Sequence, residues 1–206
     1  MTTGSSRQGS RVYRKRRRAE LELETRRRIT EATVKLHGTV GPAQTTVSGI
    51  ADEAGVQRAT VYRHFPDGQA LFDACTAHFY GLHPMPDIDR WASIADPDER
   101  MRRALADLYA WYAGTEDMLT NTQRDVAHVP PATRERFLSY FRAARDVLVR
   151  GRRERGRARA RAAAAIGHAI AFRTWQSLVR EQGLADAEAV ELMARMVAGA
   201  GLARSR

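Results

Sequence analysis

The sequence contains one cysteine among 206 residues, so an internal disulfide is impossible. A zinc site built from several cysteines of the chain is excluded for the same reason. No apolar run approaches the roughly 18 to 20 residues that cross a bilayer, and the N-terminus lacks the apolar stretch of a signal peptide. We therefore expect a cytoplasmic protein that is neither secreted nor inserted into a membrane.

Lysine is nearly absent as well, because only Lys15 and Lys35 occur among 34 basic residues and the rest are arginine. With 24 acidic residues the formal net charge is +10, which favours a polyanionic partner such as nucleic acid. GC-rich coding explains an arginine excess as readily as selection for phosphate contacts does. Nucleic-acid binding must therefore be argued from local patterns and not from net charge.

No segment alternates apolar and polar residues as a half-buried strand does. Apolar residues instead recur every three or four positions along most of the chain, and 43% of residues are apolar, enough for a buried core. The predicted fold class is therefore all-α. Residues 1–19 lack apolar anchors and contain the basic run 14–18, so they are predicted to be a disordered basic arm. A first amphipathic helix is predicted over residues 20–37.

Two short helices separated by a glycine are predicted between residues 45 and 66. The first begins after Thr45-Thr46, where a threonine can cap the helix start, and ends at Gly55, which tolerates the left-handed backbone that terminates helices. The second spans residues 57–65 and stops at Pro66. Two short helices joined by a tight turn form a helix-turn-helix, whose second helix enters the major groove of DNA.

The polar residues of this second helix fall into two groups by the chemistry of their side chains. Glutamine pairs with adenine, arginine pairs with guanine, and a small methyl side chain contacts thymine. The predicted base-contacting residues are Gln57, Arg58, Ala59 and Thr60. The predicted phosphate-contacting residues are Tyr62, Arg63 and His64. The alternative is a surface helix of mixed polarity in a helical protein of another kind.

These residues resemble the N-terminal domain of TetR-family transcriptional regulators over residues 25–80. The resemblance is carried by Thr-Thr-Val at 45–47, Ile-Ala at 50–51, Ala-Gly-Val at 54–56, Thr-Val-Tyr-Arg-His-Phe-Pro at 60–66 and Leu-Phe at 71–72. The motifs are specific because the turn, the Tyr-x-His-Phe ending and the following apolar helix occur together and in order.

The resemblance implies three functional regions beyond the arm. They are a three-helix DNA-binding domain at 20–66, a connecting helix at 67–83 and a helical ligand-binding and dimerisation domain at 84–206. Family members usually act as homodimeric repressors that a small molecule releases from DNA. The resemblance also assigns phosphate contacts to Thr46, Tyr62 and His64.

The sequence departs from the family pattern at two positions. Gln57 stands where many members have a small hydroxyl residue, and no lysine lies near Gly68, where many members grip the DNA backbone. The basic run 14–18 compensates if it enters a flanking minor groove, as basic arms do in other DNA-binding folds. The alternative is that residues 1–18 form a solvated tail.

Beyond Pro86 the sequence predicts further helices. The first covers residues 97–113 and begins at Asp96-Pro97, which supplies a capping residue and a proline at the first helical position. The others are a shorter stretch from 116, a helix from Pro130-Pro131 to about Leu148, and two final helices at 158–181 and 186–199. Aromatic residues on the apolar faces of the central helices are the predicted lining of an effector pocket, namely Tyr109, Tyr112 and Phe141. The alternative is that these aromatic side chains only fill the core.

By family resemblance, the last two helices pair with their copies in a four-helix dimer interface. The candidate contacts are Ile166, Ile170, Leu178, Met193 and Val197. The basic cluster 150–161 either contacts DNA or an acidic effector, or forms a solvated connection. His128 and His168 are more typical of core or surface hydrogen-bonding groups than of metal ligands, and Cys75 of a small buried hydrophobe than of a redox sensor.

The sequence thus predicts a sequence-specific transcriptional regulator, a repressor released from a pseudo-palindromic operator by a small-molecule effector. The alternative is an architectural protein that binds nucleic acid without sequence specificity. An enzyme in the C-terminal helices lacks support, because no Ser-His-Asp set, phosphate loop, metal-ligand spacing or paired carboxylates occur there. No catalytic residue, metal or cofactor is predicted.

Overall fold

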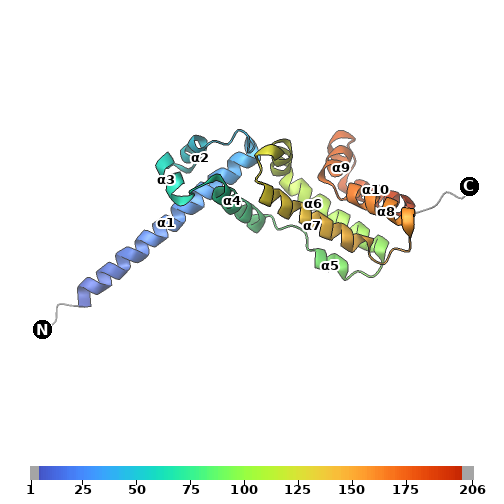
Figure 1. Ribbon diagram of the computed structural model, residues 1–206, viewed down its shortest axis with the longest axis horizontal. Helices are drawn as coiled ribbons and strands as arrows, with labels where there is room; N and C mark the ends of the chain where they lie inside the picture. The colour runs from blue at the N-terminus through green and yellow to red at the C-terminus, as the bar shows by residue number, and fades with distance from the viewer. Residues whose placement is uncertain (1–4, 201–206) are drawn as a thin grey trace, which may run out of the picture.

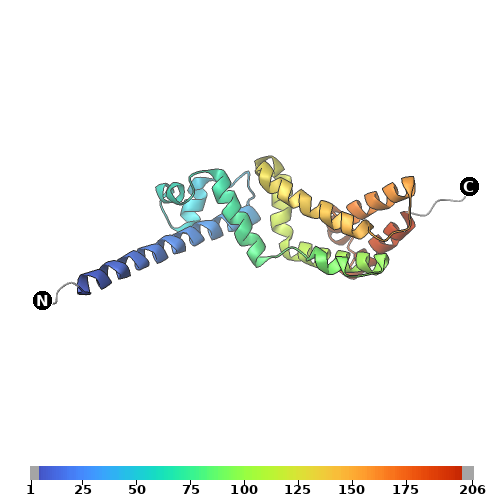
Figure 2. The same ribbon diagram turned by 60° about the horizontal axis from the view of Figure 1, so that its bottom comes forward.

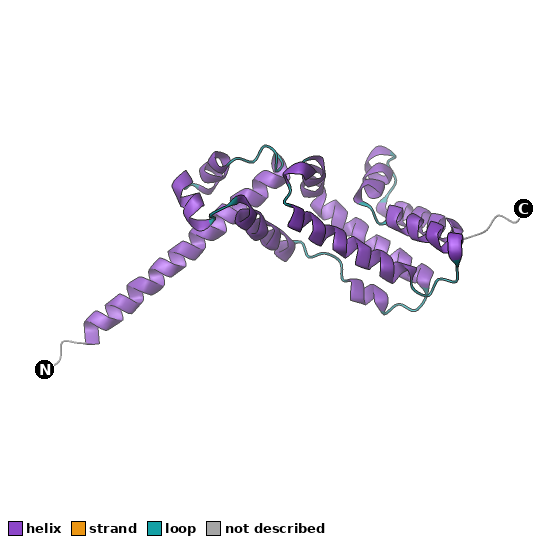
Figure 3. Ribbon diagram, in the orientation of Figure 1, coloured by secondary structure: helices purple, strands orange, loops and turns teal. Residues whose placement is uncertain are grey.

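The computed structural model describes residues 5–200, and within that range the chain is helical without a strand (Figure 3). The α-helices are α1 (Ser5–Thr39), α2 (Val47–Ala54), α3 (Arg58–His64), α4 (Gly68–Leu82), α5 (Ile88–Ala92), α6 (Pro97–Arg124), α7 (Pro131–Val149), α8 (Gly156–Ala169), α9 (Phe172–Gln176) and α10 (Asp186–Ala200). A 3₁₀ turn, η1 (Val126–His128), follows α6, and a π-helical turn, η2 (Ser177–Glu181), follows α9. The all-α prediction is confirmed. None of the described helices is both long and apolar enough to cross a bilayer.

The buried residues form two clusters that follow each other along the long axis of the molecule (Figure 1). Helices α1 to α4 enclose the first cluster, which centres on Ile29, Ile50, Val61 and Phe65. Helices α5 to α10 enclose the second and larger cluster, whose largest fully buried side chains include Trp91 and Trp175. The end of α1 and the end of α6 meet at the junction of the two clusters.

Polar caps fix the starts of several helices. Thr46 Oγ1 accepts a hydrogen bond from Gly49 N at 3.0 Å, and Asp67 Oδ1 accepts one from Ala70 N at 2.7 Å. Asp96 Oδ1 accepts hydrogen bonds from the backbone N–H groups of Asp98 and Glu99 in the first turn of α6, which begins at Pro97. These caps satisfy donors that a helix leaves unpaired at its start. The caps predicted at Thr45-Thr46 and at Asp96 are confirmed, with Thr46 as the capping threonine.

Helix α1 begins fifteen residues earlier than the sequence predicts. Residues 5–19 continue the helix and project from the molecule as a rod (Figures 1 and 2), which corrects the expectation of disorder in that part of 1–19. Residues 1–4 lie outside the described range. Arginine and glutamate favour helix, and pairs four residues apart support it, with Arg16 Nε 3.0 Å from Glu20 Oε1 and Arg18 Nε 3.1 Å from Glu22 Oε1.

Helix α6 is one continuous element from Pro97 to Arg124, where the sequence predicts a helix to 113 and a shorter one from 116. Gly114 does not interrupt it. A glycine in a helix interior costs about 1 kcal/mol relative to alanine. Burial of Tyr112 and Leu119 on either side of the glycine outweighs that cost, because both pack into the second cluster.

The predicted helix over 158–181 is wrong as a single element, because α8 ends at Ala169 and α9 begins at Phe172. Tyr109 donates its hydroxyl hydrogen to Ala169 O at 2.9 Å, and Tyr112 donates to Ile170 O. Thr174 Oγ1 donates to His168 O at 2.6 Å. These side chains satisfy the carbonyl groups that a continued helix would have paired, so the chain can turn here.

Candidate nucleic-acid interface and internal cavity

The helix-turn-helix is built around Gly55. Its φ of 63° and ψ of 42° are left-handed, and its backbone N–H reaches the carbonyls of Ala51 and Asp52 at the end of α2. Val61 of α3 and Phe65, directly after it, are each 2% exposed and belong to the same buried cluster as Ile50 of α2. The turn and these apolar contacts fix the angle at which α3 leaves α2, and the opposite face of α3 stays open.

Two arginines of α1 hold the carboxyl ends of α2 and α3. Arg28 donates to the carbonyls of Ala54 and Gly55, the latter at 3.1 Å. Arg26 Nη1 donates to His64 O at 2.5 Å, and its guanidinium lies 4.1 Å from the centre of the Phe65 ring. A cation at a helix C-terminus pairs with carbonyls that lack partners. Sequence reasoning missed both arginines, because their partners are backbone atoms far along the chain.

The structure exposes most of the residues predicted to contact DNA. Gln57, Arg58, Ala59, Tyr62 and Arg63 are exposed on α3, and Thr60 is half-buried. Thr46 is exposed at the start of α2, where its oxygen accepts the capping bond and its hydroxyl hydrogen stays available to a phosphate. One helix thus presents an arginine and a glutamine at its start and a tyrosine and an arginine one turn later.

His64 is placed differently from the other predicted phosphate contacts. It is half-buried, and its Nε2 is enclosed without a hydrogen-bond partner among the described residues. Burial, together with the positive charges of Arg63 and Arg26, lowers the pKa of His64 below its ordinary value. The ring is therefore a neutral group at neutral pH, and its Nε2 does not face solvent.

The start of α4 carries no cation. Asp67 caps the helix there, and a methyl group built on Gly68 would meet no atom within 4 Å. An open helix start attracts phosphate through its backbone N–H groups, but a carboxylate already occupies the capping position. The start of α4, where the sequence lacks the lysine expected near Gly68, is therefore capped by the acidic side chain of Asp67.

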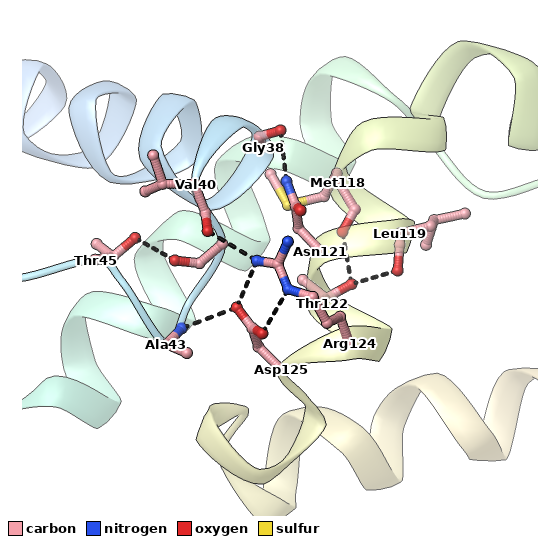
Figure 4. A network of polar contacts seen from close by, with 11 residues as sticks. Gly38, Val40, Ala43, Thr45, Met118, Leu119, Asn121, Thr122, Arg124 and Asp125 are labelled. Carbon is pink, nitrogen blue, oxygen red and sulfur yellow. Dashed lines mark hydrogen bonds and ion pairs between the residues drawn. The ribbon is translucent and has the colours of Figure 1, made fainter.

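A polar network joins the end of α6 to the turn that precedes α2 (Figure 4). Arg124 Nη2 donates to Val40 O at 2.8 Å, and Asn121 Nδ2 donates to Gly38 O at 2.8 Å. The backbone N–H of Ala43 donates to Asp125 Oδ2 at 3.1 Å. Hydrogen bonds from the Arg124 guanidinium hold the pKa of Asp125 at about 2, so the carboxylate stays charged. We call these side chains, Asn121, Arg124 and Asp125, the junction clamp.

Gly41 lets the clamp close. Its φ is 91°, a left-handed conformation that side chains disfavour. A methyl group built on it would lie 2.2 Å from Arg124 Nη2 and 2.3 Å from Asp125 Oδ2. Because glycine has no side chain, the turn between α1 and α2 can lie directly against Arg124 and Asp125 at the end of α6.

A cavity of about 530 Å³ lies beside the clamp, between α1, α4, α6, η1 and the start of α7. Its walls are mainly apolar, with Phe72 and Phe79 from α4, Met118 from α6 and Phe137 from α7. Helices of both buried clusters therefore share one cavity. A second cavity of about 310 Å³ adjoins it along α7 and is also lined by Phe137.

Two of the three aromatic residues predicted to bind an effector lie elsewhere. Tyr109 and Tyr112 have no exposed surface and line neither cavity, and their hydroxyls are bonded to the backbone between α8 and α9. Their placement corrects the expectation that they line an effector pocket. Both tyrosines lie on the inward face of α6 and fill the core. Phe141 lines the second cavity.

Cys75 and His37 form a buried pair on the wall of the larger cavity. The Cys75 sulfur lies 3.4 Å from His37 Nδ1. Burial raises the pKa of Cys75 to about 12 and lowers the pKa of His37 to about 4. Both groups are neutral at neutral pH, which fits a small buried hydrophobe better than a reactive thiolate.

The lowered pKa of His37 predicts a pH dependence of stability. The unfolded chain binds a proton on this ring near pH 6.5, whereas the folded protein binds it near pH 4. Acidification between these values therefore favours the unfolded state, and stability falls by about 2 kcal/mol from pH 7 to pH 5. We expect urea unfolding of His37→Gln to show this fall reduced by that amount. An unchanged fall would refute the assignment, and the exposed His128→Gln is the control.

The remaining sequence candidates are scattered over the surface and the second cluster. His128 and His168 are exposed on η1 and α8, and no group of three or more potential metal ligands occurs among the described residues. In the basic cluster 150–161, Arg152 is buried and lies 3.2 Å from Asp98. Four of the predicted dimer contacts, Ile166, Ile170, Met193 and Val197, are buried within the protomer, and Leu178 is half-buried.

Comparison with known proteins identifies the N-terminal region. Residues 29–75 match the family model described as bacterial regulatory proteins, tetR family. No curated protein sequence matches the chain.

Two solved structures share the fold at low sequence identity. A Clostridium perfringens protein described as a "putative fatty acid metabolism regulator" is 14% identical, with a TM-score of 0.62 over 86% of this chain and 100% of its own. A TetR transcription regulator from Haloarcula marismortui is 16% identical, with a TM-score of 0.53 over 86% of this chain and 96% of its own. At these identities the likeness concerns the fold alone.

Proposed function

The N-terminal domain of this protein belongs to the tetR family of bacterial regulatory proteins, and from that premise we propose that the chain is a homodimeric repressor of transcription. It binds a pseudo-palindromic operator through α3 and leaves it when a small molecule binds. The observation that carries the proposal is the open polar face of α3, held by the Gly55 turn and by Arg26 and Arg28. The chain needs no catalytic residue, metal or cofactor for this function.

The exposed residues of α3 divide the work of recognition. Arg58 and Gln57 stand at the helix start, where a recognition helix meets base edges, and Ala59 and Thr60 follow them. Tyr62 and Arg63 lie a turn later and hold phosphates together with Thr46. His64 supports this surface through its carbonyl, which accepts a hydrogen bond from Arg26.

Two substitutions test this division. We expect Arg58→Ala to cost about 1 to 3 kcal/mol in each half-site of the preferred operator and to relax the choice of base at one position of each half-site. Tyr62→Ala should weaken binding to all DNA sequences by a similar factor, since phosphate contacts carry no sequence information. The measurement is binding of each variant to a panel of singly substituted operators at fixed salt. A uniform loss for both variants would contradict the assignment of Arg58.

The projecting start of α1 offers a further phosphate contact. Arg26 of α1 contacts the end of α3 through its guanidinium group. The basic run 14–18 precedes Arg26 by eight to twelve residues on the same helix. At the rise of an α-helix this places the run about 12 to 18 Å farther along the rod. Arg16 and Arg18 bond to glutamates of the same helix. We propose that the run contacts DNA phosphates beside the site that α3 reads.

Removing charge from the rod tests this contact. The double variant Lys15→Gln with Arg17→Gln should lower affinity and reduce the slope of log affinity against log salt by about four, because each of the two copies in the dimer loses two phosphate contacts. The control is Arg102→Gln with Arg195→Gln, which removes the same charge from α6 and α10. An unchanged slope in the Lys15 and Arg17 variant would indicate a solvated helix that does not touch DNA.

The dimer is proposed to form through α8 and α10, but through residues other than those predicted. A contact between copies needs side chains that the protomer leaves open. On α10 these are Leu192, 40% exposed, and Met196, 54% exposed, which lie one turn apart on the same face. Their apolar surface is largely uncovered within the protomer, whereas Met193 and Val197, on the adjacent side of the helix, already pack inside.

Effector release is proposed to act through the junction of the two clusters. A molecule in the larger cavity would touch α4 beside α6, next to the clamp that holds the turn before α2. Paired recognition helices must meet successive major grooves about 34 Å apart. A ligand that binds more tightly when this spacing is wrong shifts the population toward the state that leaves DNA.

A further inference from the structure

The wall of the larger cavity is mainly apolar, with scattered polar side chains such as Thr76 and Gln123, and it carries an arginine at one end. Phe72, Phe79, Met118, Val129 and Phe137 form much of the lining. At the first turn of α7 the lining changes character to Thr133 and Arg134. A ligand that fits such a space has an apolar body and a polar group at one end.

Arg134 is the unusual residue at this end. Its Nε is enclosed and has no hydrogen-bond partner among the described residues. The other arginines of α7 have carboxylate partners, since Arg136 lies 2.5 Å from Asp73, Arg145 lies 3.6 Å from Asp146, and Arg142 pairs with Glu135. A buried donor without a partner is costly, and this one lies on the wall of a cavity, where a ligand can supply the missing acceptor.

The helix that carries Arg134 strengthens the preference for an anion. α7 has 19 residues, starts at Pro131, and has no side-chain cap at Pro130. The positive end of its dipole therefore faces the same end of the cavity as Arg134. Pro131 has no N–H group, and those of Thr133 and Arg134 donate to Pro130 O at 3.0 and 3.1 Å, so the dipole adds to the positive potential without offering these groups to a ligand.

No cation site competes with this arrangement in the described lining. Glu135 is the acidic side chain of the lining, but it pairs with Arg142 and is 63% exposed to solvent. His37, on the opposite wall, is held neutral by burial. The field at the polar end is therefore positive.

We propose that the cavity binds a small amphipathic acid, whose carboxylate pairs with Arg134 at the start of α7 and whose apolar body packs among the phenylalanines of α4 and α7. This inference rests on the effector-responsive function proposed above and names the chemical class of the effector. The bound acid contacts α4 and α6 together, so it acts at the same junction as the clamp.

Binding of matched probes to the DNA-free protein tests the proposal. Isothermal titration would compare decanoate with decanol and with decyltrimethylammonium, which share the chain and differ in the head group. We expect decanoate to bind at least tenfold more tightly than either. Arg134→Gln should weaken decanoate binding about tenfold and leave decanol binding unchanged, because only the carboxylate uses the guanidinium. Arg136→Gln, which removes the same charge two residues away, should retain decanoate binding.

The outcomes separate this inference from the proposed function. Equal binding of decanoate and decanol, equal effects of Arg134→Gln and Arg136→Gln, or no decanoate binding would each overturn the amphipathic acid, even if the protein binds an operator. Decanoate binding that depends on Arg134 would support the ligand class. Operator binding is measured separately without ligand, so its failure would refute the regulator and not the cavity ligand.

Discussion

Replacing Gly41 with alanine is expected to lower the free energy of unfolding by about 3 kcal/mol. A left-handed conformation costs a side chain about 1 to 2 kcal/mol, and each displaced hydrogen bond costs about 1 kcal/mol more. The new methyl group would collide with Arg124 and Asp125, the side chains that hold the turn before α2. Urea unfolding measures the loss.

A second glycine variant shows whether the loss of stability is specific to position 41. Gly114→Ala on α6 is the matched control, because that glycine lies in a helix interior with no atom within 4 Å of an added methyl group. We expect the control to gain up to about 1 kcal/mol through helix propensity. If Gly41→Ala were as stable as the original protein, the clamp would not be the close-fitting contact described here.

Replacing Arg100 with methionine is expected to cost about 4 kcal/mol. Arg100 is 5% exposed and donates four hydrogen bonds to carbonyl oxygens. The acceptors and distances are Ile94 at 2.9 Å, Ala95 at 3.1 Å, Val147 at 3.0 Å and Arg150 at 2.8 Å. Methionine fills a similar space without a donor, so the buried carbonyl of Val147 and the part-buried carbonyls of Ile94, Ala95 and Arg150 lose a charged partner.

Arg102→Met is the control for this prediction. Arg102 lies on the same helix, but its side chain is half exposed and makes a single ion pair with Glu191 at 3.1 Å. Exposed ion pairs contribute up to about 1 kcal/mol, so the control should unfold within that range of the original protein. Equal losses in the two variants, measured by urea unfolding, would show that the four carbonyl bonds of Arg100 add little.

The sequence predicted the helix-turn-helix well because its signals are local. Thr46 as a cap, Gly55 as a left-handed turn and the four-residue spacing of Val61 and Phe65 are each read within a few residues. Local rules also gave the start of α6 at Asp96-Pro97. Where residues close in sequence determine the start or end of a helix, the sequence pattern alone is sufficient to predict it.

The effector site was harder to predict because its walls come from distant segments. His37, Phe72 and Met118 meet only in the folded chain, and no spacing links them. Tyr109 and Tyr112 look like pocket residues on a helical projection, but their hydroxyls bond to the end of α8, a contact that no local pattern reveals. The Arg134 side chain likewise becomes distinctive only when the neighbouring arginines are seen to be paired.

In the proposed function, two copies of α3 read a defined operator. The most direct measurement selects bound fragments of the source genome at physiological salt and footprints the best of them. We expect a protected inverted repeat whose half-sites lie about one helical turn apart, with specific affinity far above non-specific affinity. Diffuse protection, with a ratio of specific to non-specific affinity near one, would contradict the account and favour an architectural nucleic-acid-binding protein.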